Sequence, residues 1–222
     1  MSSNAATGRL MRMVSSCLLA APWLAAVPAA ACPEAPPPAE YAIHHADHGE
    51  IGRHVITFAC AGEELIVETV IEGEVKVLMI PVFRRAARYR EVWRGDRLVA
   101  FESRFEDNGE VYEVGARAEG GRTVIDGRAG RLVAPATVVS NHPWNHAVID
   151  RTLLFDTRSG ALQQVRVEAA GEDEITVDGR AVRALRYVVS GDLARELWYG
   201  QDGTWLQSRL DYRGDAITLT HR

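Results

Sequence analysis

Six of the seven histidines fall into two groups, and imidazole clusters are typical of metal sites and of acid–base chemistry. The groups are His44, His45, His48 and His54 near the start of the folded region, and His142 and His146 around Pro143-Trp144. A hairpin turn at His48-Gly49 would place His45 and His54 on one face. Zinc needs three or four ligands. His45 and His54 are therefore a candidate metal pair without a complete ligand set, and no cofactor is predicted.

The segment 140–146 concentrates polar and aromatic side chains between predicted strands. Loops held by rigid elements often carry function, so this segment is a candidate ligand-binding loop. The candidate ligand-binding residues are His142, Trp144 and His146, with Trp93 and Trp198 from two similar hairpins. The structural alternative is that Trp144 only fills the end of the sheet.

An internal similarity links the two halves of the chain. Glu91-Val92-Trp93-Arg94-Gly95 recurs as Glu196-Leu197-Trp198-Tyr199-Gly200, and Ser103-Arg104-Phe105-Glu106 recurs as Ser208-Arg209-Leu210-Asp211. Both matches share an offset of 105 residues, and Ala61-Gly62-Glu63 has a weaker echo in Ala170-Gly171-Glu172. The pattern predicts an internal duplication, with halves at about 41–118 and 160–222 joined by an irregular connector at about 134–154.

The repeated hairpin also predicts cross-strand pairs. A turn at Asp202-Gly203 places Glu196 opposite Arg209 and Trp198 opposite Gln207. By the same repeat, Glu91 and Arg104 form the equivalent pair. We interpret both pairs as structural contacts that set strand register. The alternative makes Glu91 and Glu196 a carboxylate pair for acid–base work, and no residue is assigned as catalytic.

Turn dipeptides containing glycine recur at strand-length intervals, and the segments between them are rich in Val, Ile, Thr, Tyr and Trp. This pattern predicts an all-β, mainly antiparallel fold. We expect a curved sheet or half-barrel of meandering hairpins with at most one or two short helices, one of them around 147–154. Strands are expected, among others, at 55–60, 65–71, 75–80, 98–105, 181–190 and 205–212.

The first 31 residues are typical of a secretory signal peptide. Arg9 and Arg12 precede an apolar run at 14–27, and Ala29-Ala30-Ala31 gives a cleavage pattern. A Pro-rich stalk at 32–40 and a single β domain at 41–222 follow. Removing 1–31 takes away two arginines and no acidic residue, which changes the net charge from −5 to −7. This charge disfavours nucleic acid as a partner, and we expect a periplasmic protein.

Cysteine usage agrees with export. Cys17 lies in the predicted signal peptide, which leaves Cys32 and Cys60 in the mature chain. In an oxidising compartment such a pair predicts a disulfide. The alternative is that Cys32, directly after Ala31, is the acylated first residue of a lipoprotein, and only then would the protein be attached to a membrane.

Several motifs resemble an exported bacterial family known as domain of unknown function 6134. They are the Glu-x-Trp hairpin, the turn Asp107-Asn108-Gly109, the run at 190–199 and the opening Gly49-Glu50-Ile51-Gly52-Arg53-His54. The resemblance covers nearly all of the mature chain and implies no activity and no catalytic residues. The family is distantly similar to periplasmic half-barrel carriers of lipoproteins and apolar ligands. Asp96 and Arg97 stand where members often have a cysteine or an aromatic residue.

The expected function is non-catalytic binding or transport of an apolar or lipid-like small molecule. Strands 65–71 and 75–80 are apolar on both faces, more than a sheet with one buried face requires. One alternative is an envelope enzyme or metal-binding protein that uses the histidine-rich hairpin or the 140–146 loop. Another is a structural component of an envelope complex. The sequence indicates no particular oligomeric state.

Overall fold

A computed structural model describes residue 32 and residues 35–78, 80–212 and 214–222, so the predicted signal peptide lies outside the described residues. The elements are β1 (Ala39–His45), β2 (Gly49–Ala61), β3 (Glu64–Val77), β4 (Ile80–Arg94), β5 (Arg97–Asp107), β6 (Glu110–Glu119), β7 (Arg122–Gly127), β8 (Gly130–Pro135), β9 (Val139–Ser140), the 3-10 helix η1 (His146–Asp150), β10 (Leu153–Phe155), β11 (Leu162–Val177), β12 (Arg180–Gly191), β13 (Arg195–Tyr199), β14 (Trp205–Tyr212) and β15 (Asp215–His221).

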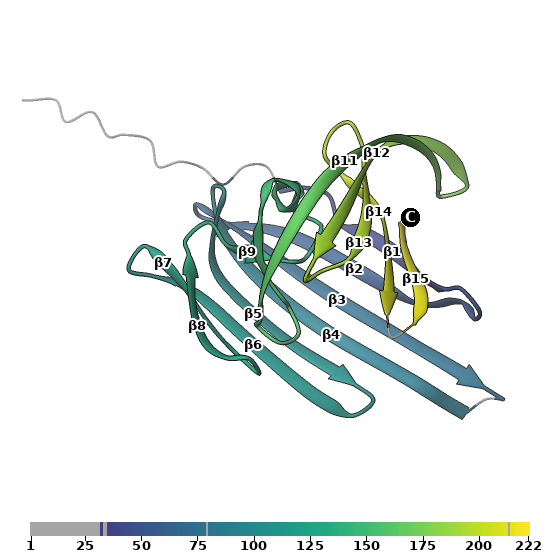
Figure 1. The fold of residues 1–222 in the computed structure, drawn as a ribbon, viewed down its shortest axis with the longest axis horizontal. Helices are drawn as coiled ribbons and strands as arrows, with labels where there is room; N and C mark the ends of the chain where they lie inside the picture. Colours follow the sequence, from purple (N-terminus) through teal and green to yellow (C-terminus); the bar gives the residue numbers. More distant parts are fainter. Residues whose placement is uncertain (1–31, 33–34, 79, 213) are drawn as a thin grey trace, which may run out of the picture.

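The strands form one sheet in which neighbours in sequence are neighbours in space (Figure 1). The order runs from β8 back to β1 and then from β15 back to β9, because the first and last strands pair in the middle. Among the described residues, β9 and β10 pair in parallel, and the other strand pairs are antiparallel. The predicted all-β, mainly antiparallel fold is confirmed. Within the described residues, no helix is long and apolar enough to cross a membrane.

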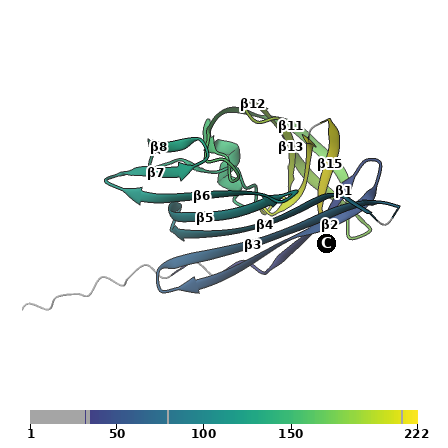
Figure 2. The ribbon, with the colours of Figure 1, turned by 90° about the horizontal axis from the view of Figure 1, so that it is seen from below.

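The sheet curls so that β7, β8 and β11–β13 lie above a floor made by β3–β6 (Figure 2). The inner segment, residues 136–161 between β8 and β11, packs against the concave side of this floor. Its Phe155 ring meets Phe101 at 5.0 Å between centroids, and the Ser103 hydroxyl donates to the Thr157 carbonyl at 2.6 Å. The middle of the half-barrel is therefore filled by the chain itself.

Alternating side chains explain why the sheet curls around a core. Along β5, buried Phe101, Ser103 and Phe105 alternate with exposed Glu102 and Arg104. A strand with this period of two buries one face and leaves the other in water. The convex face is charged and the concave face carries the core.

One predicted strand is wrong. The segment 75–80 contains the turn between β3, which ends at Val77, and β4, which begins at Ile80. Leu78 has a φ of 49°, in the left-handed region. The turn was missed because non-glycine residues rarely take this conformation, so an apolar run without Gly, Asn or Asp looks like a strand.

The repeated hairpins differ in their loops. Tyr199 pairs with Trp205 across the loop 200–204. Glu196 lies opposite Arg209 and Trp198 opposite Gln207, as predicted from the hairpin turn. In the first hairpin Arg94 pairs directly with Arg97, which shifts the register.

The predicted pair of Glu91 with Arg104 is therefore wrong. Glu91 lies opposite Phe101, and Arg104 lies opposite Arg88 on one side and Glu113 on the other. The echo also differs in structure, because Ala61-Gly62 lies at the turn that ends β2 whereas Ala170-Gly171 is a bulge inside β11. The duplication itself stays a prediction.

A disulfide joins Cys32 to Cys60, with 5.9 Å between the Cα atoms, as predicted. It fixes the chain before β1 to the end of β2. The sheet begins at Ala39, two residues before the predicted start of the domain at 41.

A glycine pair lets β2 and β3 approach closely. Gly52 lies opposite Gly73. A Cβ at position 52 would lie 2.0 Å from the Glu72 carbonyl oxygen, a distance that only backbone movement relieves. Both strands are long and paired on either side, so such movement distorts the sheet.

We expect Gly52→Ala to lower the free energy of unfolding by about 2 kcal/mol or more, because overpacking against backbone forces a shift. The matched control is Gly115→Ala on β6, where an added Cβ meets nothing within 4 Å. Urea denaturation of both variants checks this. Equal stability of the two variants would contradict the close approach.

Candidate functional site

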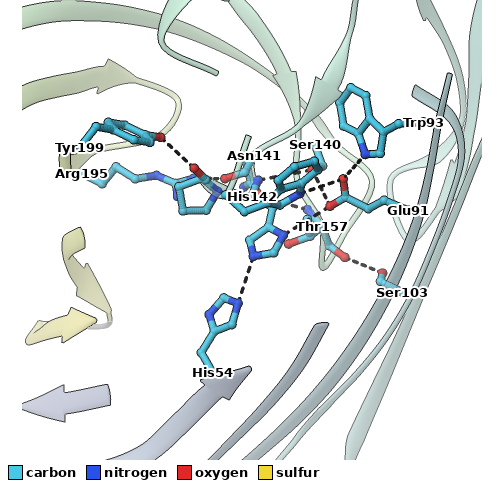
Figure 3. Close-up of polar contacts among 12 residues, drawn as sticks. His54, Glu91, Trp93, Ser103, Ser140, Asn141, His142, Thr157, Arg195 and Tyr199 are labelled. Carbon is cyan, nitrogen blue, oxygen red and sulfur yellow. Dashed lines mark hydrogen bonds and ion pairs between the residues drawn. The ribbon is translucent and has the colours of Figure 1, made fainter. Parts of the chain in front are cut away.

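The site is centred on Glu91, a fully buried carboxylate on the concave face of β4 (Figure 3). The indole nitrogens of Trp93 and Trp144 donate to its Oε2 at 2.8 and 3.1 Å. The Ser140 hydroxyl and His142 Nδ1 approach its Oε1 at 3.4 and 3.3 Å. A buried carboxylate is costly unless such donors surround it. Glu91 thus binds the inner segment to the sheet.

A chain of hydrogen bonds continues from Glu91 to a second buried histidine. His142 Nε2 lies 3.0 Å from His54 Nε2 on β2, and the two rings are stacked. With Glu91 ionised, His142 donates from Nδ1 and accepts at Nε2, so His54 carries its proton on Nε2. His54 Nδ1 is then a buried acceptor, and it has no partner among the described residues. Burial, and next the neighbouring His142, hold the pKa of His54 well below its usual value.

Several contacts hold the loop that carries His142. The Asn141 backbone N–H donates to the Phe155 carbonyl, and its side-chain amide donates to Asp156 and Gln163. The Tyr199 hydroxyl donates to the Pro143 carbonyl at 2.9 Å. The loop is thus clamped from β13 and from its own segment, so its orientation does not depend on His142 alone.

An inner hollow of about 160 Å³ opens beside the two histidines. It is lined by His54, Ile71, Tyr89, Asn141, His142, Pro143, Thr157, Arg195, Trp205, Ser208, Leu210 and Leu219. Arg195 is partly exposed and donates from Nη2 to the Asn141 carbonyl at 2.6 Å. Burial is the main cause that lowers the pKa of Arg195 to about 10, so the guanidinium stays charged at neutral pH.

An outer hollow of about 310 Å³ follows along the same strands. It is lined by His45, His48, Ile51, Val75, Val82, Phe83, Asn108, Tyr212, Asp215 and Ile217. On β15 and β14, Ile217 and Tyr212 come two residues away from Leu219 and Leu210 of the inner hollow, on the same face. On β3, Gly73 stands between Ile71 and Val75 and adds no side chain there. The two hollows therefore succeed each other along the concave face.

A second buried acid, Asp107, supports the outer hollow. Its Oδ2 accepts from the Tyr212 hydroxyl at 2.8 Å, Arg158 at 2.9 Å and Arg85 at 3.2 Å. The Arg85 guanidinium also stacks over the Tyr212 ring at 4.1 Å. Burial raises the pKa of Asp107, but the Tyr212 hydrogen bond and the two arginines outweigh it and lower the pKa overall. These contacts hold the Tyr212 ring in the wall.

The predicted ligand-binding residues separate in space. Trp93, His142 and Trp144 all converge on Glu91. His146 packs against the ring of Tyr199, with 4.7 Å between the ring centroids. Tyr199 is the residue whose hydroxyl holds the Pro143 carbonyl. Trp198 lies elsewhere, where its indole nitrogen donates to Asp173 at 2.9 Å.

The proposed carboxylate pair is not formed. Glu196 pairs with Arg186 and Arg209 and is partly exposed, whereas Glu91 is enclosed by tryptophans and His142. The repeat therefore has a glutamate at both positions, but the two side chains lie in different surroundings.

The candidate metal pair is wrong. His45 lies 3.6 Å from Asp215 and beside His48, while His54 contacts His142. A bulge after Ile43 breaks the register, so His54 pairs with Tyr41 far from the turn. In the part of the chain that the structure describes, no group of three His, Cys, Asp or Glu side chains gathers as a metal site.

Sequence reasoning missed the central role of Glu91, and it missed Arg195 and Asp107. A signal existed for Glu91, because it stands between Tyr89 and Trp93 on the buried face of a strand with period two. A charged residue on an apolar face needs partners, which marks it as a centre of polar contacts. No local pattern marked Arg195.

The family model described as domain of unknown function (DUF6134) matches residues 41–222. The chain belongs to this family. The match confirms the resemblance inferred from the sequence, and it assigns no activity.

A search of curated proteins finds no match. Among solved structures, the DUF6134 chain is similar to a β-barrel-like protein of domain of unknown function DUF1849 from Brucella abortus. The two share 12% identity, with a TM-score of 0.57 over 83% of this chain and 95% of the other. This similarity supports the fold alone.

We expect Glu91→Ala to lower the free energy of unfolding by about 3 to 5 kcal/mol, because it leaves buried donors without an acceptor and creates a cavity. Glu196→Ala, at the equivalent position of the repeat, should cost no more than about 1 kcal/mol, since its ion pairs are solvent-exposed. Chemical denaturation of both variants measures the difference. Similar losses in the two variants would show that Glu91 is not the centre of the site.

We expect stability to fall as the pH drops below about 6.5, because the unfolded chain then binds a proton that buried His54 does not. His54→Gln keeps a donor for His142 and does not titrate. It should reduce the slope of stability against pH by about 1 kcal/mol per pH unit between pH 6 and 5. His221, whose pKa burial also lowers, continues to contribute.

The control for this measurement is His48→Gln at the exposed turn. Denaturation curves recorded from pH 7.5 to pH 5 compare the three proteins. An unchanged slope in His54→Gln would show that His54 is not held neutral.

Proposed function

We propose that this DUF6134 protein is a non-catalytic binding protein of the bacterial envelope that carries an apolar, lipid-like ligand on its concave face. The observation that carries the proposal is the succession of two hollows along β3, β14 and β15. Small-molecule sites are typically about 300 to 1,000 Å³ with mostly apolar walls and few polar groups. The outer hollow, at about 310 Å³, lies within this range, and the inner one extends it.

The ligand would lie to one side of the half-barrel, because the inner segment fills the centre. The outer hollow has apolar walls from Val75, Phe83 and Ile217. At its mouth Val82 is 55% exposed, although most large apolar side chains in the described residues are covered. Ligand burial there would remove this apolar surface from water.

Export to the periplasm is part of the proposal. The disulfide between Cys32 and Cys60 is typical of an oxidising compartment. In this disulfide the Cys32 sulfur is bonded to Cys60, and a lipoprotein would carry its lipid on the same sulfur atom. Together with the predicted signal peptide, this favours a soluble exported form over one anchored through Cys32.

An enzyme is the second candidate, because one observation favours it. The hydrogen-bond chain from Glu91 through His142 to His54 joins the two histidine groups of the sequence and borders the inner hollow. Such a chain moves protons in acid–base catalysis. If ligand turnover is found, His54→Gln and His142→Gln should abolish it, whereas simple binding should survive both changes.

The proposal predicts that the mature protein binds a neutral apolar dye such as Nile red. Ile217→Glu places a charge in the outer hollow and should weaken binding at least about tenfold, since burial of an unpaired charge is costly. Thr218→Glu, the next residue on the opposite face of β15, is the matched control and should bind normally. Fluorescence titration measures both.

Intact mass spectrometry of protein recovered from the bacterial envelope gives an independent check. Under native conditions we expect a small apolar adduct, and under denaturing conditions a chain that starts at Cys32 with one disulfide. Absence of dye binding together with absence of any adduct would contradict the proposed function.

A further inference from the structure

The inner hollow differs in chemistry from the outer one. Arg195 in its wall donates to the Asn141 carbonyl but, within the described ranges, makes no ion pair with a carboxylate. A cation in a partly enclosed site is stabilised by an anion that enters with matching geometry.

The acids near this hollow are already engaged. Asp156 accepts hydrogen bonds from Asn141, from the Arg158 and Ser159 backbone and from the Ser159 hydroxyl. Glu91 is enclosed by its own donors on the other side of His142. Neither acid lines the hollow or forms an ion pair with Arg195, so the Arg195 guanidinium is the charged group in its wall.

Size limits what can enter. A volume of about 160 Å³ corresponds to about five water molecules at about 30 Å³ each. This space suits a small polar head group. A single guanidinium pairs best with a planar carboxylate through two parallel hydrogen bonds.

From these observations we infer that the inner hollow binds the carboxylate of an acyl chain whose tail lies in the outer hollow. The inference rests on the proposed function and narrows its ligand class to carboxylic acids. Arg195 supplies the charge. The Ser208 hydroxyl, which accepts from the Trp205 indole at 2.9 Å, still has its own proton to donate.

The distance between the hollows fits a chain of moderate length. On β15, Leu219 lines the inner hollow, and Asp215, four residues earlier in the chain, lines the outer one. At about 3.3 Å per residue this is a separation of about 13 Å. Leu219, Ile217, Leu210 and Tyr212 line the path between the head and the mouth.

The test is isothermal titration calorimetry of the full mature protein with octanoate, 1-octanol and acetate at one ionic strength. We expect octanoate to bind at least about tenfold more tightly than 1-octanol, and acetate to bind weakly. Equal binding of octanoate and 1-octanol would overturn the carboxylate site while leaving the apolar carrier intact. If acetate binds as tightly as octanoate, the site takes a free carboxylate and the link to the tail is overturned.

Arginine variants test whether Arg195 binds the carboxylate. Arg195→Gln should reduce octanoate binding to the level of 1-octanol, and Arg195→Lys should restore part of the difference. The control Arg209→Gln removes an exposed arginine that pairs with Glu196 and should leave octanoate binding unchanged. Thermal denaturation verifies that each variant is folded. If Arg195→Gln does not fold, the comparison of octanoate with 1-octanol in the wild-type protein still tests the inference. Unchanged octanoate binding by folded Arg195→Gln would overturn the inference. If neither octanoate, 1-octanol nor Nile red binds, the proposed function itself fails.

Discussion

A carboxylate without contact with water has to be surrounded by donors, and Glu91 imposes this requirement on the whole fold. Trp93 comes from its own strand, but the other donors come from the inner segment more than forty residues later. The segment can satisfy Glu91 only by entering the concave side of the sheet. Once it is there, Val138, Val148 and Phe155 complete a core that the curved sheet cannot form alone.

Filling the centre of the half-barrel determines where a ligand can lie. The space that remains runs along β3, β14 and β15, between the clamped His142 loop and the turn that carries His48. Asp107 keeps Arg85 and Tyr212 in place at its side. Gly73 contributes no side chain where the two hollows meet. The inner hollow has the Arg195 guanidinium in its wall, and the wall of the outer hollow is mostly apolar, which gives the groove a direction.

Sequence patterns correctly predicted the features that can be recognised within one strand or from residue type. Period-two alternation and glycine turns gave the antiparallel sheet, and the two cysteines gave the disulfide. They failed where register depended on loop length or on a bulge. Glu91 was assigned to Arg104 because the repeat suggested equal hairpins, and His45 to His54 because the hairpin was taken as regular. A register change by an odd number of residues turns a side chain to the other face, which is why Arg104 is exposed while Glu91 is buried.

The sequence by itself determined the fold class, the cysteine pair and the concentration of polar and aromatic residues at 140–146, because these depend on local periodicity and residue type. The tertiary structure alone decided that His142 contacts both Glu91 and His54, and that Arg195 borders the same hollow as the two histidines. These residues come from β2, β4, the inner segment and β13, and no short pattern encodes contacts between strands that the curl of a sheet brings together. The physical reason is that burial of the carboxylate selects partners by position in space, irrespective of their distance along the chain.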